Sequence, residues 1–380
     1  IDHVVDTLVT SVLTHHSVPL AGTVDDVESV DLPAVLRRGD GSSVYTIAGS
    51  NLYTSQAILT AESRITARAG QHDGHRIPTS AVDLALLEST ANGLTLNAGQ
   101  ATLVKAMATS GARVQLAIAP AGAGKTTAIE TLARAWTDNG GTLIALAPSA
   151  AAADVLATTI TPADSDSTSK AATDTLAKLA WHITHPDDDG PVPDWVTGIG
   201  PTTLVVIDEA GMADTLTLDT VIEYAISRGA SVRLIGDDQQ LAAVGAGGVL
   251  RDIAAAHGAV HLSELMRFTN PAEAAASLAL RDGHLEAIGF YLDNRRLHIG
   301  DQDTLLDDIL SAWAADHAAG RDAIMLAPTR DLVATLNAQA RTHRLTQQQG
   351  TIEAAIDGGS ACSHPLTSTN THGQQAGSVG

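Results

Sequence analysis

A glycine-rich run that ends in a lysine and two threonines is the part of this sequence best suited to bind phosphate. It reads Pro120-Ala121-Gly122-Ala123-Gly124-Lys125-Thr126-Thr127 and lies between an apolar stretch and a segment with helical periodicity. Glycines adopt backbone angles closed to other residues, so the loop can turn its amide groups toward a nucleotide. The positive end of the following helix adds to the attraction. We expect the residues from Ala121 to Thr127 to bind ATP, with Lys125 at the β- and γ-phosphates and the Thr126 hydroxyl on Mg²⁺.

One position departs from the usual pattern of such a loop. The pattern G-x-x-x-x-G-K-[ST] would place glycine at residue 119, where this chain has Ala119. Alanine is the smallest substitute, so we expect the loop to be preserved if φ at Ala119 is negative. The alternative is a chance glycine-rich turn before a helix, which the flanking apolar strand makes the weaker interpretation.

An acidic pair, Asp208 and Glu209, directly follows the apolar run at 203–207. Ligands of open α/β sheets bind at the carboxyl ends of the strands, which is where this pair would lie. Asp208 would hold Mg²⁺, usually through water, and Glu209 would act as general base on the attacking water. Alone, such a pair could simply cap a helix. Its place in the same predicted sheet as Lys125 favours the catalytic interpretation.

The elements that would position these groups are apolar strands, each followed by a helix. The strands are predicted at 114–119, 142–147, 203–207 and 231–235. Near-continuous apolar strands that alternate with helices predict a parallel sheet with helices on both faces. We therefore expect an α/β fold of the P-loop NTPase type over residues 96–260, preceded by a small N-terminal accessory domain at 1–95.

A second, shorter α/β unit is predicted from residue 261 to 345. Its best strand is at 322–327, followed by a helix over 331–341. The hydrophobic periodicity is lost after Leu345. Residues 346–380 are therefore predicted to be an irregular tail or an incomplete segment.

Composition narrows the function classes. The chain has 22 Lys and Arg against 43 Asp and Glu, a net charge of −21, which does not suit a broad nucleic-acid-binding surface. A narrow basic groove on an acidic body remains compatible with these numbers. The single cysteine, Cys362, excludes an intrachain disulfide and a cysteine-based metal cluster. No signal peptide or membrane span is recognisable, so we expect a cytoplasmic protein without membrane contact.

Several stretches resemble the motifs of superfamily 1 helicases. Residues 207–212 (IDEAGM) and 236–241 (GDDQQL) resemble motifs II and III. The continuation at 242–247 (AAVGAG) is similar to the RecD-like branch, and above all to the helicase part of MobF-type conjugative relaxases (TraI/TrwC-like). The resemblance covers most of residues 1–345. It implies one RecA-like domain with motifs Q, I, Ia, II and III, the start of another with motif IV, and truncation at both ends.

The resemblance also assigns roles to further residues. Residues 96–100 (LNAGQ) resemble the Q motif, in which Gln100 would read the adenine, and 147–152 (APSAAA) resemble motif Ia, a contact for single-stranded DNA. Gln240 would sense phosphate, and Arg267 would contact the γ-phosphate. Each has a plainer alternative: Gln240 could be a turn residue, and Arg267 could be an ordinary surface arginine.

The resemblance implies a motor that couples ATP hydrolysis to movement along single-stranded DNA in conjugative plasmid transfer. Motifs V and VI are not visible, which would leave this chain able to bind ATP and a poor hydrolase by itself. The His-hydrophobe-His signature of the relaxase half is not visible either, so a relaxase domain would be a partner in the full-length protein. The alternatives are a P-loop ATPase that remodels protein and a degenerate module without turnover. Lys125 and Glu209 together argue against the degenerate module.

Overall fold

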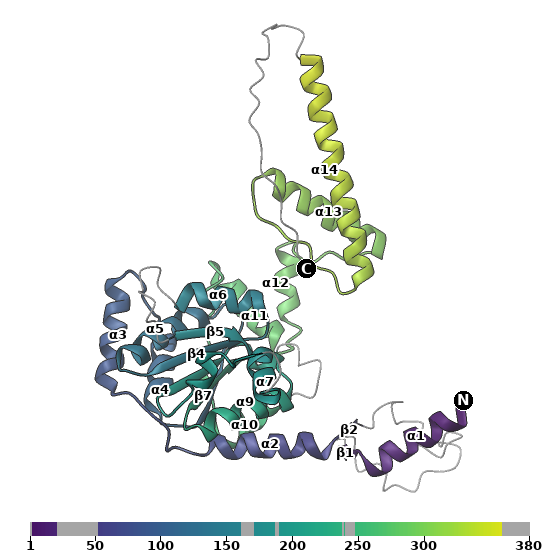
Figure 1. The fold of residues 1–380 in the computed structure, drawn as a ribbon. Helices are drawn as coiled ribbons and strands as arrows, with labels where there is room; N and C mark the ends of the chain where they lie inside the picture. Colours follow the sequence, from purple (N-terminus) through teal and green to yellow (C-terminus); the bar gives the residue numbers. More distant parts are fainter. Residues whose placement is uncertain are drawn as a thin grey trace. The chain divides into compact units, whose positions relative to one another are not determined.

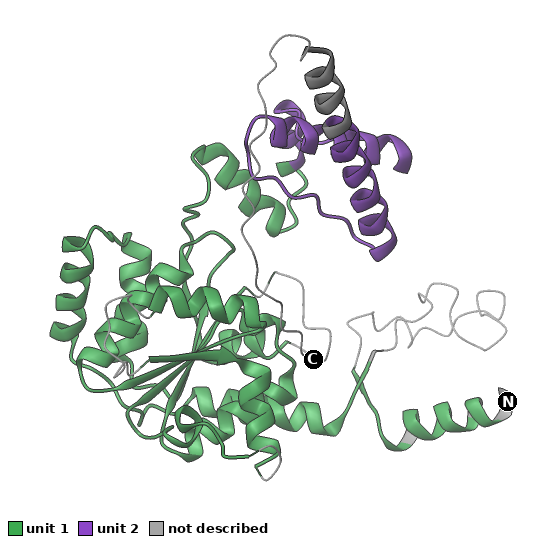
Figure 2. Cartoon of the chain, turned by 45° about the horizontal axis from the view of Figure 1, so that its top comes forward, with its two compact units in different colours: residues 1–287 green, residues 288–380 purple. Residues whose placement is uncertain are grey.

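A computed structural model of the chain describes residues 2–20, 52–160, 171–186, 190–237, 239 and 248–358. The chain divides into two compact units, Ile1–Ala287 and Ile288–Gly380, which Figure 2 shows in different colours. The domain boundaries predicted after residues 95 and 260 both lie within the first unit. In the described residues, we find no helix with both the length and the apolar character that a membrane crossing requires.

The first unit is built on a six-stranded parallel sheet with the strand order β5-β4-β6-β7-β3-β8. Four strands begin and end within one residue of their predicted bounds: β3 Val114–Ile118, β4 Thr142–Ala147, β6 Thr203–Ile207 and β7 Ser231–Gly236. The sequence pattern does not predict the two edge strands, β5 Ala171–Thr175 and β8 Val260–His261. Because β5 is only half-buried along its whole length, it lacks the apolar run that marks the inner strands.

Helices cover both faces of the sheet, as Figure 1 shows. Side chains alternate along each strand, so that Leu143 and Ala145 of β4 join one hydrophobic core, whereas Ile144 and Leu146 join the other. The first core lies under α3 Thr79–Ala91, α4 Ala98–Thr109, α5 Lys125–Asp138 and α6 Ala150–Ile160. The second lies under α2 Gln56–Ala69, α7 Leu176–Thr184, α8 Asp194–Thr197, α9 Thr215–Ser227 and α10 Val249–His257. The predicted α/β class, a parallel sheet with helices on both faces, is confirmed.

The N-terminal region is continuous with this core from α2 onward. Its earlier described elements are α1 Asp2–His15 and an antiparallel pair of strands, β1 Val18–Leu20 and β2 Leu52–Thr54. Ile65 and Ala69 of α2 are buried in the second core, and Val82 and Ala85 of α3 are buried in the first. The part of residues 1–95 from α2 onward therefore shares the cores of the sheet, because these helices bury their apolar faces against it.

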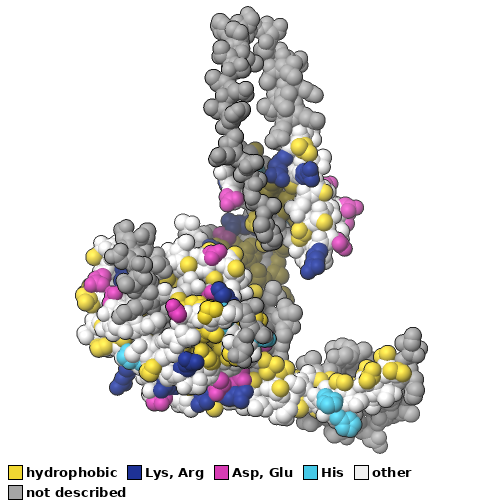
Figure 3. All heavy atoms as spheres, viewed as in Figure 1, with side chains coloured by type: hydrophobic (Ala, Val, Ile, Leu, Met, Phe, Trp, Pro, Cys, Tyr) yellow, Lys and Arg dark blue, Asp and Glu magenta, His cyan; other side chains and the backbone are white. Residues whose placement is uncertain are grey.

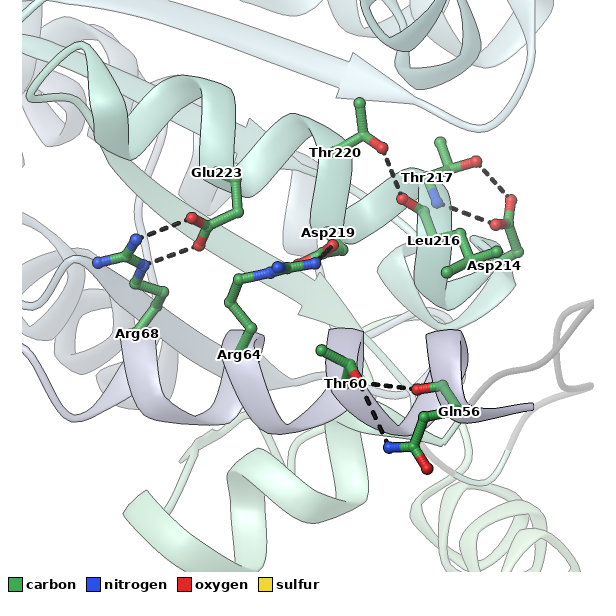
Figure 4. Close-up of polar contacts among 10 residues, drawn as sticks. All are labelled: Gln56, Thr60, Arg64, Arg68, Asp214, Leu216, Thr217, Asp219, Thr220 and Glu223. Atoms are coloured by element: carbon green, nitrogen blue, oxygen red, sulfur yellow. Dashed lines mark hydrogen bonds and ion pairs between the residues drawn. The ribbon is translucent and has the colours of Figure 1, made fainter. Parts of the chain in front are cut away.

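Two arginines of α2 fasten it to α9 (Figure 4). Arg64 donates from Nε to Asp219 at 2.8 Å, Arg68 donates from Nε to Glu223 at 2.7 Å, and both guanidinium groups bind their carboxylates through two nitrogens. The spacing of four residues on each helix places the two pairs on successive facing turns. These two pairs join α2 to α9 on the face of the sheet that the second core covers.

A buried arginine caps one of the helices that lead to the site. Arg233 of β7 is fully buried and donates to the carbonyl oxygens of Met107 at 2.9 Å and Ala112 at 2.8 Å. The Met107 carbonyl belongs to the last turn of α4, whose carbonyls have no partner within the helix. Burial lowers the pKa of Arg233 to about 9. This contact anchors the carboxyl end of α4, whose amino end lies under the glycine-rich loop.

All regular secondary structure among the described residues of the second unit is helical. It comprises most of α12 Ala287–Asp293, together with α13 Gln302–Ala318 and α14 Arg330–Gly358. The strand predicted at 322–327 is wrong, since these residues form neither helix nor strand, and Ile324 and Leu326 are 83% and 80% exposed. An apolar run becomes a strand only beside a neighbouring strand that completes its hydrogen bonds, and the described part of this unit contains none.

The end of the chain also differs from expectation. The sequence predicts irregular structure from residue 346, whereas α14 continues through Gly358. Its glutamine-rich part is polar but contains no proline that would end a helix. Residues 359–380, with Cys362, lie outside the described residues.

Candidate functional site

The glycine-rich loop joins β3 to α5, and the helix begins at Lys125 itself. Gly122 and Gly124 have φ values of +83° and +76°, in the region that favours glycine. Ala119 is fully buried, its N–H donates to the carbonyl of Gly236 at 2.8 Å, and it is not among the described non-glycine residues with positive φ. Alanine is therefore accommodated where the usual pattern has glycine.

The lysine of this loop and the acidic pair of β6 lie together. Lys125 forms an ion pair through Nζ with the Glu209 carboxylate, and the lysine side chain is only 9% exposed. Asp208 lies close enough for the charges of Lys125 and Glu209 to act on its carboxyl group. The strand order explains this meeting, because only β7 separates β3 from β6 and all three end at the same edge of the sheet.

The backbone of Glu209 is held in an unusual conformation. Its φ and ψ are 51° and 40°, in the left-handed region, immediately before the short 3₁₀ turn η3 Ala210–Met212. This conformation costs a non-glycine residue about 1–2 kcal/mol. The Glu209 N–H donates to the Asp208 side chain at 3.0 Å, which helps to hold the turn. Strain of this kind concentrates at functional sites, and here it lies at the residue that pairs with the loop lysine.

The oxygen groups at this edge fit Mg²⁺ chemically. Thr126 offers a hydroxyl at the start of α5, and Asp208 offers a carboxylate at the end of β6. Mg²⁺ prefers hard oxygen ligands and commonly uses one or two protein groups, with water and substrate phosphates completing its shell. Burial raises the pKa of Asp208 and the charge of Glu209 raises it further, while Lys125 opposes both effects.

We expect Asp208→Asn to raise the melting temperature of the metal-free chain near pH 7.5 by about 2 °C. A carboxyl group whose pKa is higher in the folded chain binds more protons there, so stability falls as pH rises through the interval between its unfolded and folded values. The asparagine variant escapes this loss, and its advantage should disappear as the pH falls toward the unfolded value. Thermal unfolding in magnesium-free buffer between pH 4 and 8 measures the effect.

Asp73→Asn is the control, because its expected change in stability has the opposite sign. A hydrogen bond from Arg113 lowers the pKa of the Asp73 carboxyl, so this variant should lose stability near neutral pH. If Asp208→Asn melted below the wild type at pH 7.5, or gained stability only on acidification, the effect attributed to burial of Asp208 would be wrong.

Gln100 lies beneath the loop. Its Oε1 accepts the Asn97 N–H at 2.9 Å and its own N–H donates to the Asn97 side chain at 2.8 Å, the two bonds of a capping box at the start of α4. Its Nε2 donates to the carbonyl of Gly124 at 3.1 Å. Both ends of the buried amide are therefore engaged by the protein. Contact with an adenine, as the resemblance implies, would require the exchange of these bonds.

Arg267 approaches the loop from another segment. The neighbouring Met266 N–H donates to the carbonyl of Gly122 at 2.8 Å. A Cβ atom added at Gly122 would lie 2.8 Å from Cβ and 3.1 Å from Nε of Arg267. The arginine side chain therefore lies against the loop, and it is exposed.

The remaining predicted residues are placed as follows. Thr127 is half-buried in the first turn of α5, and Ala121 is exposed on the loop. The stretch 148–151 is exposed at the carboxyl end of β4, on the same edge of the sheet as the loop. Gln240 lies outside the described residues.

Sequence reasoning did not find one ion pair at this edge. Arg281, the last residue of α11 Pro271–Arg281, donates from Nε to Asp237 at 3.0 Å. Asp237 follows β7 and is buried. The two residues are 44 positions apart in the chain, and no local pattern joins them.

A family model described as an AAA domain matches residues 95–302. The matched span includes the glycine-rich loop, the acidic pair, Arg267 and Arg281.

Two conjugal transfer proteins are similar to this chain. The probable conjugal transfer protein TraA of Sinorhizobium fredii is 25% identical over 312 residues, which are 80% of this chain and 26% of that protein. The conjugal transfer protein TraA of Rhizobium radiobacter is 27% identical over 236 residues, which are 60% of this chain and 20% of that protein. The chain thus spans only about a quarter of the first of these relatives and a fifth of the second.

Two solved structures of helicases align with part of this chain. Pif1 helicase from Candida albicans aligns with a TM-score of 0.39 and 16% identity, over 63% of this chain and 60% of its own. The UvsW helicase from bacteriophage T4 aligns with a TM-score of 0.34 and 11% identity, over 65% of this chain and 90% of its own. These TM-scores are too low to add to what the sheet topology shows.

Proposed function

Because this chain belongs to the AAA domain family, we propose that it binds ATP with Mg²⁺ and hydrolyses it as the motor of a DNA helicase. The observation that supports this best is the meeting of Lys125, Asp208 and Glu209 at one edge of the sheet. The TraA relatives support a role in conjugative transfer. The sequence motifs that resemble those of conjugative relaxases add a relaxase domain of the full-length protein as the proposed partner. The proposed location is the cytoplasm, where ATP is available.

The residues in and around the loop would have separate roles in binding ATP and Mg²⁺. The backbone from Ala121 to Thr127 would surround the phosphates, and the start of α5 would direct its free N–H groups toward them. Thr126 and Asp208 would hold Mg²⁺, which supplies positive charge next to the β- and γ-phosphates. Gln100 would support the loop from below and contact the base, and Arg267 would add positive charge from above.

To bind a phosphate, Lys125 would have to exchange its ion pair with Glu209. A triphosphate would draw Lys125 away from the glutamate, because its charge exceeds that of a single carboxylate. Glu209 would then be free to accept a proton from the attacking water as general base. Gln240 would sense the γ-phosphate.

Single-stranded DNA would cross the same edge of the sheet. The exposed stretch 148–151 follows β4, next to β6 in the sheet, and offers small residues that allow close approach. On the face that Figure 3 shows, basic and acidic side chains of the described residues in the first unit are interspersed. With a net charge of −21, we expect a narrow contact with DNA that weakens steeply with salt.

The ATPase rate of the 380-residue chain, measured with and without single-stranded DNA, tests the proposal. We expect a rise of about tenfold with DNA, an ordinary scale for coupling between two sites. Lys125→Ala should lose turnover with and without DNA. Lys105→Ala is the matched control, because Lys105 lies on α4 in an exposed pair with Asp83. A wild type that neither binds nucleotide nor differs from Lys125→Ala would overturn the proposal.

Two other results would support one of the alternative functions instead. Turnover that ignores DNA and rises with a protein substrate would favour a remodelling ATPase. ATP binding without turnover under every condition would favour the degenerate module.

A further inference from the structure

The segment that contains α11 contacts the candidate site at both of its ends. At its start, the Met266 N–H donates to the carbonyl of Gly122 in the glycine-rich loop at 2.8 Å. At its end, Arg281 binds Asp237, the residue that follows β7. Asn270 caps the helix between these points by accepting the Ala272 N–H at 2.9 Å. Residues 266–281 therefore connect the phosphate loop with the end of β7.

The contact between Arg281 and Asp237 is the stronger of the two ties. Nε of Arg281 lies 3.0 Å and 3.1 Å from the two carboxylate oxygens, and Nη2 lies 2.5 Å from Oδ1. The aspartate side chain is 1% exposed and the arginine side chain 21%. A carboxylate so deeply buried depends on its partner, because removal of the arginine would leave an uncompensated charge. The hydrogen bond with Asp237 accordingly raises the pKa of Arg281.

Asp237 in turn contacts two loops of the site. Its Oδ1 accepts the N–H of Gln239 at 3.1 Å. Its carbonyl oxygen would lie 3.1 Å from a Cβ atom added at Gly211, two residues after Glu209. The backbone after the acidic pair therefore packs directly against Asp237. A side chain that holds Asp237 in place therefore also acts on Gln239 and on the turn that contains Gly211.

We propose that Arg281 is a positioning residue for ATP hydrolysis, acting through Asp237 on the turn η3 after Glu209 and on Gln239. The effect of Arg281 on catalysis rests on the proposed ATPase function. Its effect on the backbone around Asp237 does not depend on that function. Arg281 touches no reacting group. Because the glycine-rich loop would bind the phosphates without it, loss of Arg281 changes kcat and leaves KM for ATP almost unchanged.

The test compares Arg281→Met and Arg281→Lys with Arg64→Met in the full 380-residue chain. Arg64 is the matched control, since it also binds a poorly exposed carboxylate through two nitrogens, with Asp219 10% exposed, but it joins α2 to α9. We expect Arg281→Met to lower kcat about tenfold or more, as for a small misplacement of catalytic groups, with KM within about twofold. Arg281→Lys, which keeps the charge, should recover part of kcat. Arg64→Met should melt earlier yet keep the wild-type kcat.

Hydrogen exchange without nucleotide separates this inference from the ATPase proposal. Arg281→Met should accelerate amide exchange in peptides that contain Gln239 and Gly211, and Arg64→Met should leave these peptides as in the wild type. Unchanged exchange in Arg281→Met, or an equal loss of kcat in Arg64→Met, would overturn the positioning role. If the wild type has no ATPase activity, the proposed function fails, and exchange alone decides whether Arg281 holds the two loops.

Discussion

We expect replacement of Glu209 by glutamine to lower ATP turnover by about 10²- to 10³-fold, the loss that removal of the proposed general base would cause. Glutamine keeps the size of the side chain but cannot accept a proton from water. The left-handed backbone at this residue and its bond to Asp208 persist, because neither involves the carboxylate of Glu209. The variant therefore isolates the chemical step from the architecture of the site.

In the same variant, we expect the affinity for ATP to rise while turnover falls. In the chain without nucleotide, Glu209 holds Lys125, and this pair must break before the lysine can meet a phosphate. The glutamine side chain releases Lys125 and also removes a negative charge near the incoming triphosphate. We expect ATP to bind more tightly by up to about fivefold, the scale of a partly exposed ion pair.

A fluorescent ATP analogue and a phosphate-release assay measure the two effects separately. Glu223→Gln is the matched control: it breaks the pair with Arg68 on the neighbouring helix and should leave turnover and affinity unchanged. If Glu209→Gln kept turnover within a few-fold of the wild type, another group would have to activate the water. If its affinity for ATP fell, the ion pair with Lys125 would not oppose binding.

The sequence predicts the inner strands of the sheet well, because burial on both faces requires a nearly continuous apolar run. β4 and β6 are apolar after their first residue, a threonine in each, and the structure reproduces their predicted bounds. The edge strand β5 contains Asp174 and two threonines, so nothing in its composition distinguishes it from a loop. The apolar run at 322–327 shows the converse, because hydrophobicity without a neighbouring strand does not produce one.

The candidate site also has contacts that the sequence predicts and contacts that it does not. The meeting of Lys125 with Asp208 and Glu209 is predictable, because a short loop and a strand end are both local and the parallel sheet joins them. The pairing of Arg281 with Asp237 is not predictable, since either charge could equally face solvent. Arg233 did carry a signal, a lone charge within an apolar strand, but its partners are backbone carbonyls, which a sequence pattern does not reveal.

Gly124→Ala should weaken ATP binding by about 100-fold or more, since misplacing groups by about 1 Å can have effects of this size. A Cβ atom at Gly124 would lie 2.1 Å from Nε2 of Gln100, so the glutamine would have to move. Its bond to the Gly124 carbonyl and the capping box of α4 would then be disturbed, and a buried amide without partners costs about 1–3 kcal/mol. The positive φ adds about 1–2 kcal/mol of backbone strain.

Two further variants separate the clash from the strain. Gly140→Ala has the same strain, with φ +85° and no atom within 4 Å of the added Cβ, so it should lose stability while ATP binding stays as in the wild type. Gln100→Ala combined with Gly124→Ala removes the clash and should be more stable than the sum of the two single losses predicts. Nucleotide affinity and thermal unfolding, measured for the wild type, the three single variants and the double variant, complete the comparison. If Gly124→Ala bound ATP as well as Gly140→Ala does, Gln100 would not hold the loop, since a clash at 2.1 Å must displace one of the two groups.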